Sequence, residues 1–294
     1  MAQQPTILVT GSHRSGTTWV GRTLALDPHV AYVHEPFNPT YERSRLAHPP
    51  RNAFVYIHDG NADHYRATVE GMLRYSLRTR PASWREASRA PARGLRVTGQ
   101  VISDRVHRLR MLVKDPLALF AAPWLTRAFG MQTITMVRHP AGFVSSLLEL
   151  GWRFNFADFA VQPDLLEGPL ANEAETIGRL AAQRSTPVED AAHLWRMLHT
   201  FIGGIEESDS LRIYRYEDVA ARPDTAFREL YARVGLPVTE LVASELAGMG
   251  TSPAIAASWH HRLDAADVAA IRDLTDEVAS QWYTDADWQL ASLP

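Results

Sequence analysis

Short apolar and β-branched runs recur along the chain, and stretches with helical periodicity separate them. Strands of this length that alternate with helices are typical of a mainly parallel sheet covered by helices. We therefore expect an α/β fold with a mainly parallel central sheet flanked by helices. The predicted strands are Ile7–Thr10, Ala31–Val33, Met111–Val113, Thr133–Val137 and Leu211–Tyr214.

Two helices in the C-terminal part of the chain have recognisable ends. Pro223 suits a first helical turn, and apolar residues then recur at helical spacing until Gly235 and Pro237 end the pattern. Asp264 can cap a second helix, whose apolar stripe runs to Trp282. Stripes of this kind usually pack in a core, so we assign them no function.

Two stretches do not follow the alternation of strands and helices. Residues 40–96 are rich in Arg, Pro, Tyr and His, and residues 152–190 contain several prolines and glycines. Inserted segments of this kind often cover a substrate site on a rigid sheet. Because the chain shows no internal repeat and no linker-like tract, we expect a single domain over residues 1–294 with these two substrate-covering insertions.

Composition narrows the classes of partner. The chain has 30 basic and 33 acidic residues, for a net charge of −3, so it lacks a global basic field for nucleic acid. It has no cysteine, which excludes disulfides, thiolate metal sites and cysteine nucleophiles. With no signal-peptide pattern and no long apolar run, we expect a cytoplasmic protein without integral membrane association. The oligomeric state is left open.

The strongest local signal is the glycine-rich segment from Gly11 to Trp19, which reads Gly-Ser-His-Arg-Ser-Gly-Thr-Thr-Trp. It follows a predicted strand and opens a helix, so its backbone N–H groups and the positive helix end converge on one anion site. The glycine spacing is nearly that of a Walker loop, but Thr17 stands where a nucleoside-triphosphate enzyme has its lysine. The basic residue of this loop is instead Arg14.

A second motif follows the strand that ends at Val137. It consists of Arg138-His139-Pro140 and a helical segment that carries Ser145 and Ser146. An arginine at the carboxyl end of a strand and a hydroxyl on the next helix can together hold a phosphate. Taken alone, Arg-x-Pro is also a common way for a strand to end before a helix.

The two motifs together resemble those of sulfotransferases that use 3′-phosphoadenosine 5′-phosphosulfate (PAPS). The loop is similar to the 5′-phosphosulfate loop of that family, which has Lys or Arg at the position of Arg14. The family's 3′-phosphate motif has a serine eight positions after its arginine, as Ser146 is after Arg138, with Ser145 as the near alternative. The resemblance implies a P-loop-like sulfotransferase fold and donor contacts from Arg14, Ser15, Gly16, Thr17, Thr18, Trp19, Arg138 and Ser146.

Further segments are similar to the family more weakly. Tyr216 lies in a Tyr-Glu-Asp segment like the one that the family places near the adenine, and Trp19 resembles the tryptophan that stacks there. Thr251 matches a further adenine-side threonine. Arg262 belongs to a segment similar to the C-terminal element that returns basic groups to the 3′-phosphate.

The resemblance departs from one subfamily at the catalytic base. Cytosolic small-molecule sulfotransferases have a Lys-Thr-His segment whose lysine lies 24 residues before the 3′-phosphate arginine, and Lys114 has that spacing. Their histidine base falls at Pro116, which cannot take a proton. Carbohydrate and tyrosylprotein sulfotransferases instead place a glutamate after the second strand, where this chain has His34 and Glu35. The resemblance at the base is therefore closer to the glutamate type.

Glu35 is accordingly our candidate base, with His34 as the alternative. At the carboxyl edge of the sheet, we expect partial desolvation to raise the pKa of Glu35 toward a value suited to a base. If the strand continues through Glu35, side-chain alternation turns His34 to the opposite face. A structural ion pair with an arginine, or a turn cap ahead of Pro36, is the other interpretation of this carboxylate. His13 either contacts a phosphate or fills a variable loop position.

The sequence thus predicts an enzyme that transfers a sulfuryl group from PAPS to a hydroxyl, or an amine, of a small-molecule, carbohydrate or lipid acceptor. The candidate catalytic residues are Glu35, Arg14, Lys114 and His34. The product is 3′-phosphoadenosine 5′-phosphate (PAP), and no metal is expected, since the histidines show no ligand spacing. The alternatives are a P-loop kinase-like phosphoryl transferase, which lacks its lysine at Thr17, and a non-catalytic nucleotide-binding protein.

Overall fold

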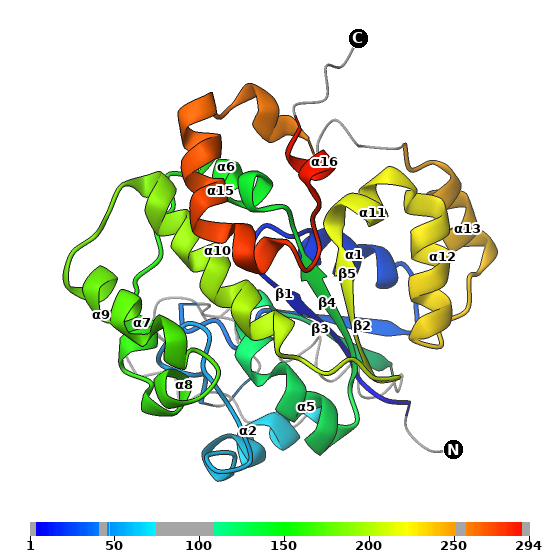
Figure 1. Cartoon of the computed structure of the whole chain (residues 1–294). Coiled ribbons are helices and arrows are strands. Elements are labelled where there is room, and N and C mark those ends of the chain that lie inside the picture. Colours follow the sequence, from blue (N-terminus) through cyan, green and yellow to red (C-terminus); the bar gives the residue numbers. More distant parts are fainter. Residues whose placement is uncertain (1–3, 41–45, 47, 75–108, 251–256, 290–294) are drawn as a thin grey trace, which may run out of the picture.

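The structure is a computed structural model that describes residues 4–40, 46, 48–74, 109–250 and 257–289. In these ranges, five parallel strands form one sheet in the order β2-β3-β1-β4-β5 (Figure 1). The predicted fold class is confirmed, and each predicted strand is present with one or two additional residues. The strands are β1 (Ile7–Gly11), β2 (Val30–His34), β3 (Arg110–Lys114), β4 (Gln132–Val137) and β5 (Leu211–Arg215).

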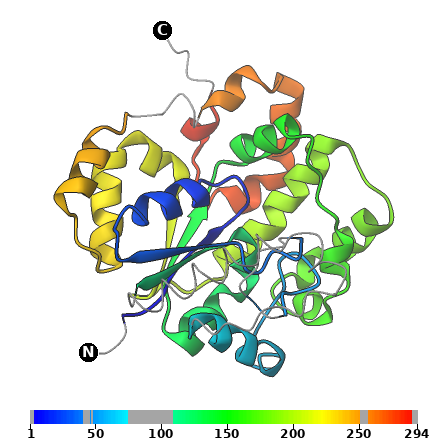
Figure 2. The same ribbon diagram turned by 180° about the vertical axis from the view of Figure 1, so that it is seen from behind.

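Side-chain alternation along the strands divides the apolar residues between two cores. Along β1, Ile7 and Val9 belong to a core shared with Phe227, whereas Leu8 belongs to the core on the opposite face. The helices α1 (Thr17–Leu24), α12 (Pro223–Arg233) and α13 (Glu240–Ala247) cover the first face. The second face is covered by α5 (Ala122–Phe129), α6 (Pro140–Glu149), α10 (Pro187–Gly203) and α15 (Ala265–Ala279) (Figures 1 and 2).

The other helices of the described ranges surround these main elements. They connect the main elements and pack onto the two cores. Their bounds are α2 (Asp63–Leu73), η1 (Pro116–Ala121), α7 (Ala157–Ala160), α8 (Pro163–Glu167), η2 (Ala171–Glu173), α9 (Ala174–Ala182), α11 (Tyr216–Ala221), η3 (Ser258–His261) and α16 (Asp285–Trp288).

Both helices predicted for the C-terminal part are confirmed. Helix α12 begins at Pro223, which suits the first turn because its missing N–H is not needed there. Helix α15 follows Asp264, whose carboxylate accepts a hydrogen bond of 2.8 Å from the backbone N–H of Asp267. The helix ends at Ala279, so Trp282 lies on the segment that follows it.

The described parts of the two inserted stretches pack against each other. The backbone N–H of Tyr56 donates to Gln162 Oε1 at 2.8 Å, and the ring of Phe54 contacts that of Phe159. Residues 75–96 lie outside the described ranges. The role of the two stretches as a cover for the substrate stays a prediction.

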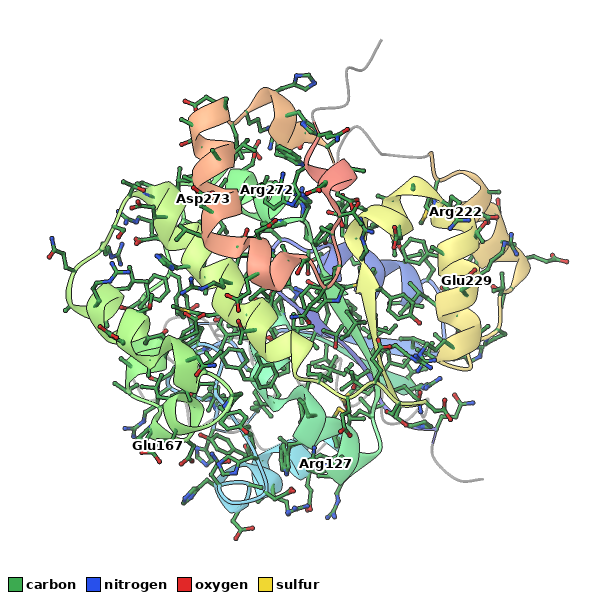
Figure 3. The ribbon with its side chains drawn as sticks, in the orientation of Figure 1. Arg127, Glu167, Arg222, Glu229, Arg272 and Asp273 are labelled. Carbon is green, nitrogen blue, oxygen red and sulfur yellow. The ribbon has the colours of Figure 1, made fainter. Side chains whose placement is uncertain are left out.

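Charged side chains lie mainly on the outer surface. Arg127, Glu167 and Asp273 are exposed on the helices that surround the sheet (Figure 3). Within the described ranges, none of the helices combines the length and the apolar character that are needed to cross a membrane.

The order of the strands determines where a ligand site is expected. β1 lies between β3 and β4, and the helix after β1 covers one face while the helix after β4 covers the other. Open α/β sheets bind ligands outside the carboxyl ends of the strands at such a point. The glycine-rich loop and Arg138 both lie at this edge, because they directly follow β1 and β4.

Candidate active site

The glycine-rich loop needs its two glycines for backbone reasons. Gly11 has φ +137°, and a Cβ there would lie 2.1 Å from the carbonyl oxygen of Met136 on β4. Gly16 has φ +85°, and its Cβ would lie 2.5 Å from a ring carbon of Tyr216. Glycine alone allows both the left-handed conformation and the close approach. The loop therefore turns tightly between β1 and α1, as predicted.

Hydroxyl groups organise the interior of the loop. Ser15 Oγ donates to the carbonyl oxygen of Ser12 at 2.6 Å, and both residues are buried. Arg14, between them, has φ +58°, an uncommon conformation for a residue other than glycine. Such conformations cluster at ligand clamps, where the surrounding structure maintains them. Thr17 is buried and Thr18 half-buried at the start of α1.

The two phosphate motifs meet, although they are far apart in the sequence. Arg14 Nε donates to Ser146 Oγ at 2.8 Å, and Arg138 donates to the carbonyl oxygen of Arg14 at 2.7 Å. The Arg138 guanidinium is buried and lies 4.9 Å from the ring centre of Tyr216. Arg138 Nε and Ser145 Oγ are buried without a hydrogen-bond partner among the described residues. Buried polar groups of this kind are normally satisfied, so their presence here fits an anionic ligand.

Aromatic residues lie beside the loop. The ring of Trp19 makes edge contacts with Tyr216 and Phe227, at centroid distances of 6.1 and 5.0 Å. The structure thus brings together the two residues assigned to the adenine side, Trp19 and Tyr216. Thr251 lies outside the described residues, and its assignment stays a prediction.

The segment around Arg262 returns to α6, but the arginine itself has another partner. The ring of Trp259 stacks on His139 at the start of α6, with centroids 5.1 Å apart. Arg262, by contrast, forms a 2.5 Å ion pair with Glu149 at the end of the same helix. A contact of Arg262 with the 3′-phosphate stays a prediction.

The predicted base and the single lysine form an ion pair. Lys114 Nζ lies 2.5 Å from Glu35 Oε1, and Asn38 Nδ2 donates to Glu35 Oε2 at 2.9 Å. The lysine side chain is 1% exposed and the glutamate side chain 21% exposed. Both carboxylate oxygens of Glu35 are therefore held from the protein side.

The pKa of Glu35 is lower than its usual value, so the expected rise is wrong. Burial alone would raise the pKa, but the hydrogen bonds from Lys114 and Asn38 outweigh it. Glu35 is ionised at neutral pH and can accept a proton, although it is a weaker base than predicted. An ion pair, the alternative interpretation of this carboxylate, is present, but its partner is Lys114 and not the expected arginine.

The condition under which side-chain alternation would turn His34 away from Glu35, a strand that continues through Glu35, is not met. Strand β2 ends at His34, and Glu35 has φ +42°, which breaks the alternation of an extended strand. His34 Nε2 consequently lies 3.8 Å from Glu35 Oε1. Burial and the nearby Lys114 lower the pKa of His34, so its imidazole is neutral at pH 7.

His13 belongs to an aromatic wall near this ion pair. Its ring lies 4.8 Å from that of Phe54 and 5.0 Å from that of Trp152, measured between centroids. Burial lowers the pKa of His13 to about 4; the charge of Glu35 opposes this shift, and that of Lys114 adds to it. The imidazole is neutral at physiological pH.

Sequence reasoning missed three residues of this site. Asn38 and Asp115 hold the turn that carries Glu35, and Trp195 Nε1 donates to the carbonyl oxygen of Arg138 at 2.8 Å. Asp115 is adjacent to Lys114 in the sequence, and Asn38 lies three residues after Glu35. Both could have been identified from their closeness to these two residues. Nothing in the local sequence links Trp195 on α10 to the end of β4.

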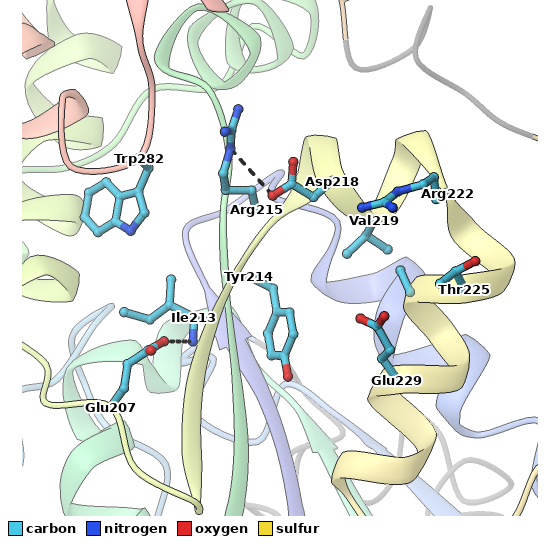
Figure 4. A pocket seen from close by; sticks show the side chains of 11 residues that line it. Glu207, Ile213, Tyr214, Arg215, Asp218, Val219, Arg222, Thr225, Glu229 and Trp282 are labelled. Atoms are coloured by element: carbon cyan, nitrogen blue, oxygen red, sulfur yellow. Dashed lines mark hydrogen bonds and ion pairs between the residues drawn. The ribbon is translucent and has the colours of Figure 1, made fainter.

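A separate pocket of about 510 Å³ lies along the outer edge of β5 (Figure 4). Its lining includes Tyr214, Trp282 and Arg222 but none of the residues assigned to the donor. Three of its charged residues have partners: Glu207 accepts the backbone N–H of Ile213, and Arg215 pairs with Asp218 and with Asp287, which lies outside the lining. In the part of the chain that the structure describes, no cluster of three side chains could hold a metal ion.

Comparison with known proteins decides the family. Residues 5–240 match the model of the sulfotransferase family. The chain belongs to this family. The loop, the Arg138 motif and the Glu35–Lys114 pair of this sulfotransferase all lie within the matched range. No curated protein matches the chain significantly.

Several solved sulfotransferases have similar structures. The sulfotransferase domain of the Synechococcus olefin synthase is 15% identical with a TM-score of 0.46, over 96% of this chain and 97% of that one. The domain from the curacin biosynthetic pathway is 14% identical with a TM-score of 0.49, over 95% and 98%. The Mycobacterium tuberculosis sulfotransferase STF1 is 18% identical with a TM-score of 0.45, over 93% and 76%. Similarity at this level carries no argument about donor or acceptor.

Proposed function

We propose that this sulfotransferase uses PAPS as its donor and a hydroxyl group, or less favourably an amine, as its acceptor. The observation that carries the proposal is the direct contact between the two phosphate motifs, in which Arg14 bonds to Ser146 and Arg138 bonds to the Arg14 backbone. PAPS carries phosphate groups at two separate positions, so its site needs two phosphate-binding motifs close to each other. A small-molecule, carbohydrate or lipid alcohol is compatible with the site.

The residues present fit this donor. The loop from Ser15 to Thr18 presents backbone N–H groups and the start of α1 to an anion. Arg138 Nε and Ser145 Oγ, which have no hydrogen-bond partner among the described residues, can donate hydrogen bonds to a second phosphate, together with the neighbouring Ser146. The rings of Trp19 and Tyr216 can contact the adenine ring of PAPS.

PAPS supplies the sulfuryl group and leaves as PAP. In the proposed reaction, Glu35 accepts the proton of the acceptor hydroxyl as the new S–O bond forms and the bond to the leaving phosphate breaks. This proton becomes acidic only as the S–O bond forms, so a carboxylate with a lowered pKa suffices as the base. Arg14 and Lys114 place positive charge where negative charge develops.

The position of the ion pair favours catalysis over mere nucleotide binding. Val9 on β1 is in register with Lys114 on β3, so the Glu35–Lys114 pair lies at the strand end next to the loop. His13 of the loop is within electrostatic reach of both Glu35 and Lys114. A protein that only binds a nucleotide needs no such pair beside its phosphate loop.

Ligand-induced thermal stabilisation tests the donor. PAP at 100 times its dissociation constant should stabilise the folded protein by about 2.7 kcal/mol, because it binds only the folded state. ATP with magnesium should stabilise much less at the same concentration, since Thr17 replaces the lysine that grips a triphosphate. An ATP shift equal to that of PAP would instead support the phosphoryl-transferase alternative.

Arg138→Ala should weaken PAP binding by about 1.5–3 kcal/mol, roughly 10- to 150-fold, because it removes a charge-assisted contact. Ser146→Ala should have a smaller effect, since it removes one neutral hydroxyl. Isothermal titration calorimetry with PAP gives both values, and Arg222→Ala at the β5 pocket is the matched control. Unchanged PAP affinity in Arg138→Ala would show that the second phosphate binds elsewhere.

A further inference from the structure

Asp115 is a fully buried carboxylate to which the proposed reaction assigns no role. It follows Lys114 directly, and its side chain is not exposed to solvent. One carboxylate oxygen accepts the backbone N–H of Phe37 at 2.5 Å, and the other accepts that of Leu117 at 2.9 Å. The first contact bridges 78 positions of sequence, whereas the second is a local helix cap.

The backbone of Asp115 also joins the neighbouring strand. Its N–H donates to the carbonyl oxygen of Val9 at 2.9 Å, and its carbonyl oxygen accepts the hydroxyl of Thr10 at 2.8 Å. Asp115 therefore connects the carboxyl ends of β1, β2 and β3. Its own position is fixed independently of Glu35, as an anchor for another segment requires.

The segment anchored by Asp115 is the turn that carries Glu35. The backbone N–H of Glu35 donates to the carbonyl oxygen of Lys114 at 2.8 Å, and two residues later Phe37 donates to the Asp115 carboxylate. Between these two anchors, Glu35 has φ +42°, a strained conformation that persists only when the surroundings impose it. Without the second anchor, the turn can relax and withdraw the Glu35 carboxylate from Lys114.

We propose that Asp115 is a positioning residue, whose carboxylate holds the Glu35 turn so that the base stays aligned beside Lys114. This inference rests on the proposed role of Glu35. Burial raises the pKa of Asp115 to about 7, with the charge of Glu35 adding to the shift and that of Lys114 opposing it. The deprotonated carboxylate offers an acceptor to each of the two N–H groups.

Asp115→Asn tests the proposal, because an amide offers only one acceptor oxygen to the two backbone N–H groups. We expect kcat to fall about 10²-fold, as for a misplaced catalytic group, while the dissociation constant of PAP changes less than about twofold. Asp27→Asn is the matched control. Asp27 is also buried and accepts a backbone N–H, from His29, but at the opposite end of β2. This control should retain wild-type kcat.

A double-mutant cycle separates positioning from general structural support. In a Glu35→Gln background, Asp115→Asn should cause no further loss of turnover, since it acts through the missing base. The proposal is wrong if Asp115→Asn lowers kcat by the same factor in the wild type and in the Glu35→Gln variant. It is also wrong if the Asp115→Asn single variant keeps full kcat while the Glu35→Gln single variant is inactive. Full turnover of Glu35→Gln itself would overturn the role of Glu35, and with it that of Asp115.

A second variant covers the case in which Asp115→Asn does not fold, as judged by circular dichroism. Asp115→Ser is smaller and keeps one hydroxyl acceptor, and it enters the same cycle with Glu35→Gln. We expect the same pattern, with lowered kcat, near-normal PAP binding and no further loss in the Glu35→Gln background. Wild-type kcat in a folded Asp115→Ser variant would overturn the proposal.

Discussion

Glu35→Gln should lower turnover about 10²–10⁴-fold while PAP still binds with near-normal affinity. Glutamine keeps the shape of the side chain and can still accept from Lys114, but it cannot take the proton of the acceptor. We expect this loss in the transfer step, because the substitution leaves the proposed donor contacts of Arg138 and Ser146 unchanged. Steady-state kinetics with PAPS, together with calorimetric titration of PAP, measure the two quantities separately.

A half-buried glutamate away from the site provides the control for this variant. Glu70→Gln changes the same functional group on α2, where Glu70 pairs with Arg74, and it should leave turnover unchanged. Near-normal turnover in Glu35→Gln, combined with loss of activity in His34→Ala or His13→Ala, would contradict the glutamate assignment. A histidine base would then replace it.

Acidification from pH 7 to pH 5 should strongly destabilise the fold. Burial lowers the pKa values of His139 and His199 to about 3, against about 6.5 in the unfolded chain. Below pH 6.5 the unfolded chain therefore binds protons that the folded chain does not, and stability falls as the pH decreases toward 3. At pH 5 each of these histidines lowers the free energy of unfolding by about 2 kcal/mol. Asp115 and Glu217, whose pKa values burial raises, bind protons more readily in the folded state and offset part of this loss.

Urea unfolding at pH 7 and pH 5 measures this dependence. His199→Phe keeps the stacking on Trp195, removes the titrating group and should reduce the pH dependence. Leu198→Met, at a buried neighbour that does not titrate, should keep the full wild-type dependence. Equal pH dependence in the wild type and in His199→Phe would show that protonation of this histidine does not drive the loss.

The fold could be predicted because its signals are local. Apolar runs that alternate with helical segments located the five strands of the described sheet within one or two residues, and Pro223 and Asp264 located the starts of two helices. The loop between β1 and α1 was equally accessible, since a left-handed position and a close approach both require glycine, as at Gly16. The apolar runs, the helix starts and the glycine spacing each lie within a few positions of the sequence, although the close approach at Gly16 is to the distant Tyr216.

The geometry of the base could not be predicted, because it depends on contacts between distant segments. The lowered pKa of Glu35 results from Lys114, which lies 79 positions away in the sequence. Glu35 has a left-handed backbone conformation that keeps His34 close to it. The same turn is held by the hydrogen bond from the Phe37 N–H to the Asp115 carboxylate, which no motif spacing in the sequence predicts. The partner of Arg262 is a similar case, since its ion pair with Glu149 depends on how η3 packs against α6.

Transfer of label from radiolabelled PAPS to an acceptor tests whether this sulfotransferase uses PAPS as its donor. The protein is incubated with labelled PAPS and a panel of alcohols from the small-molecule, carbohydrate and lipid classes, with EDTA present. We expect a labelled organic product and one PAP released for each label transferred, with both reduced at least about 10²-fold in Glu35→Gln. PAPS-dependent transfer with Glu35 as the base is wrong if the protein neither binds PAP nor transfers label from PAPS, or if Glu35→Gln transfers label at the wild-type rate.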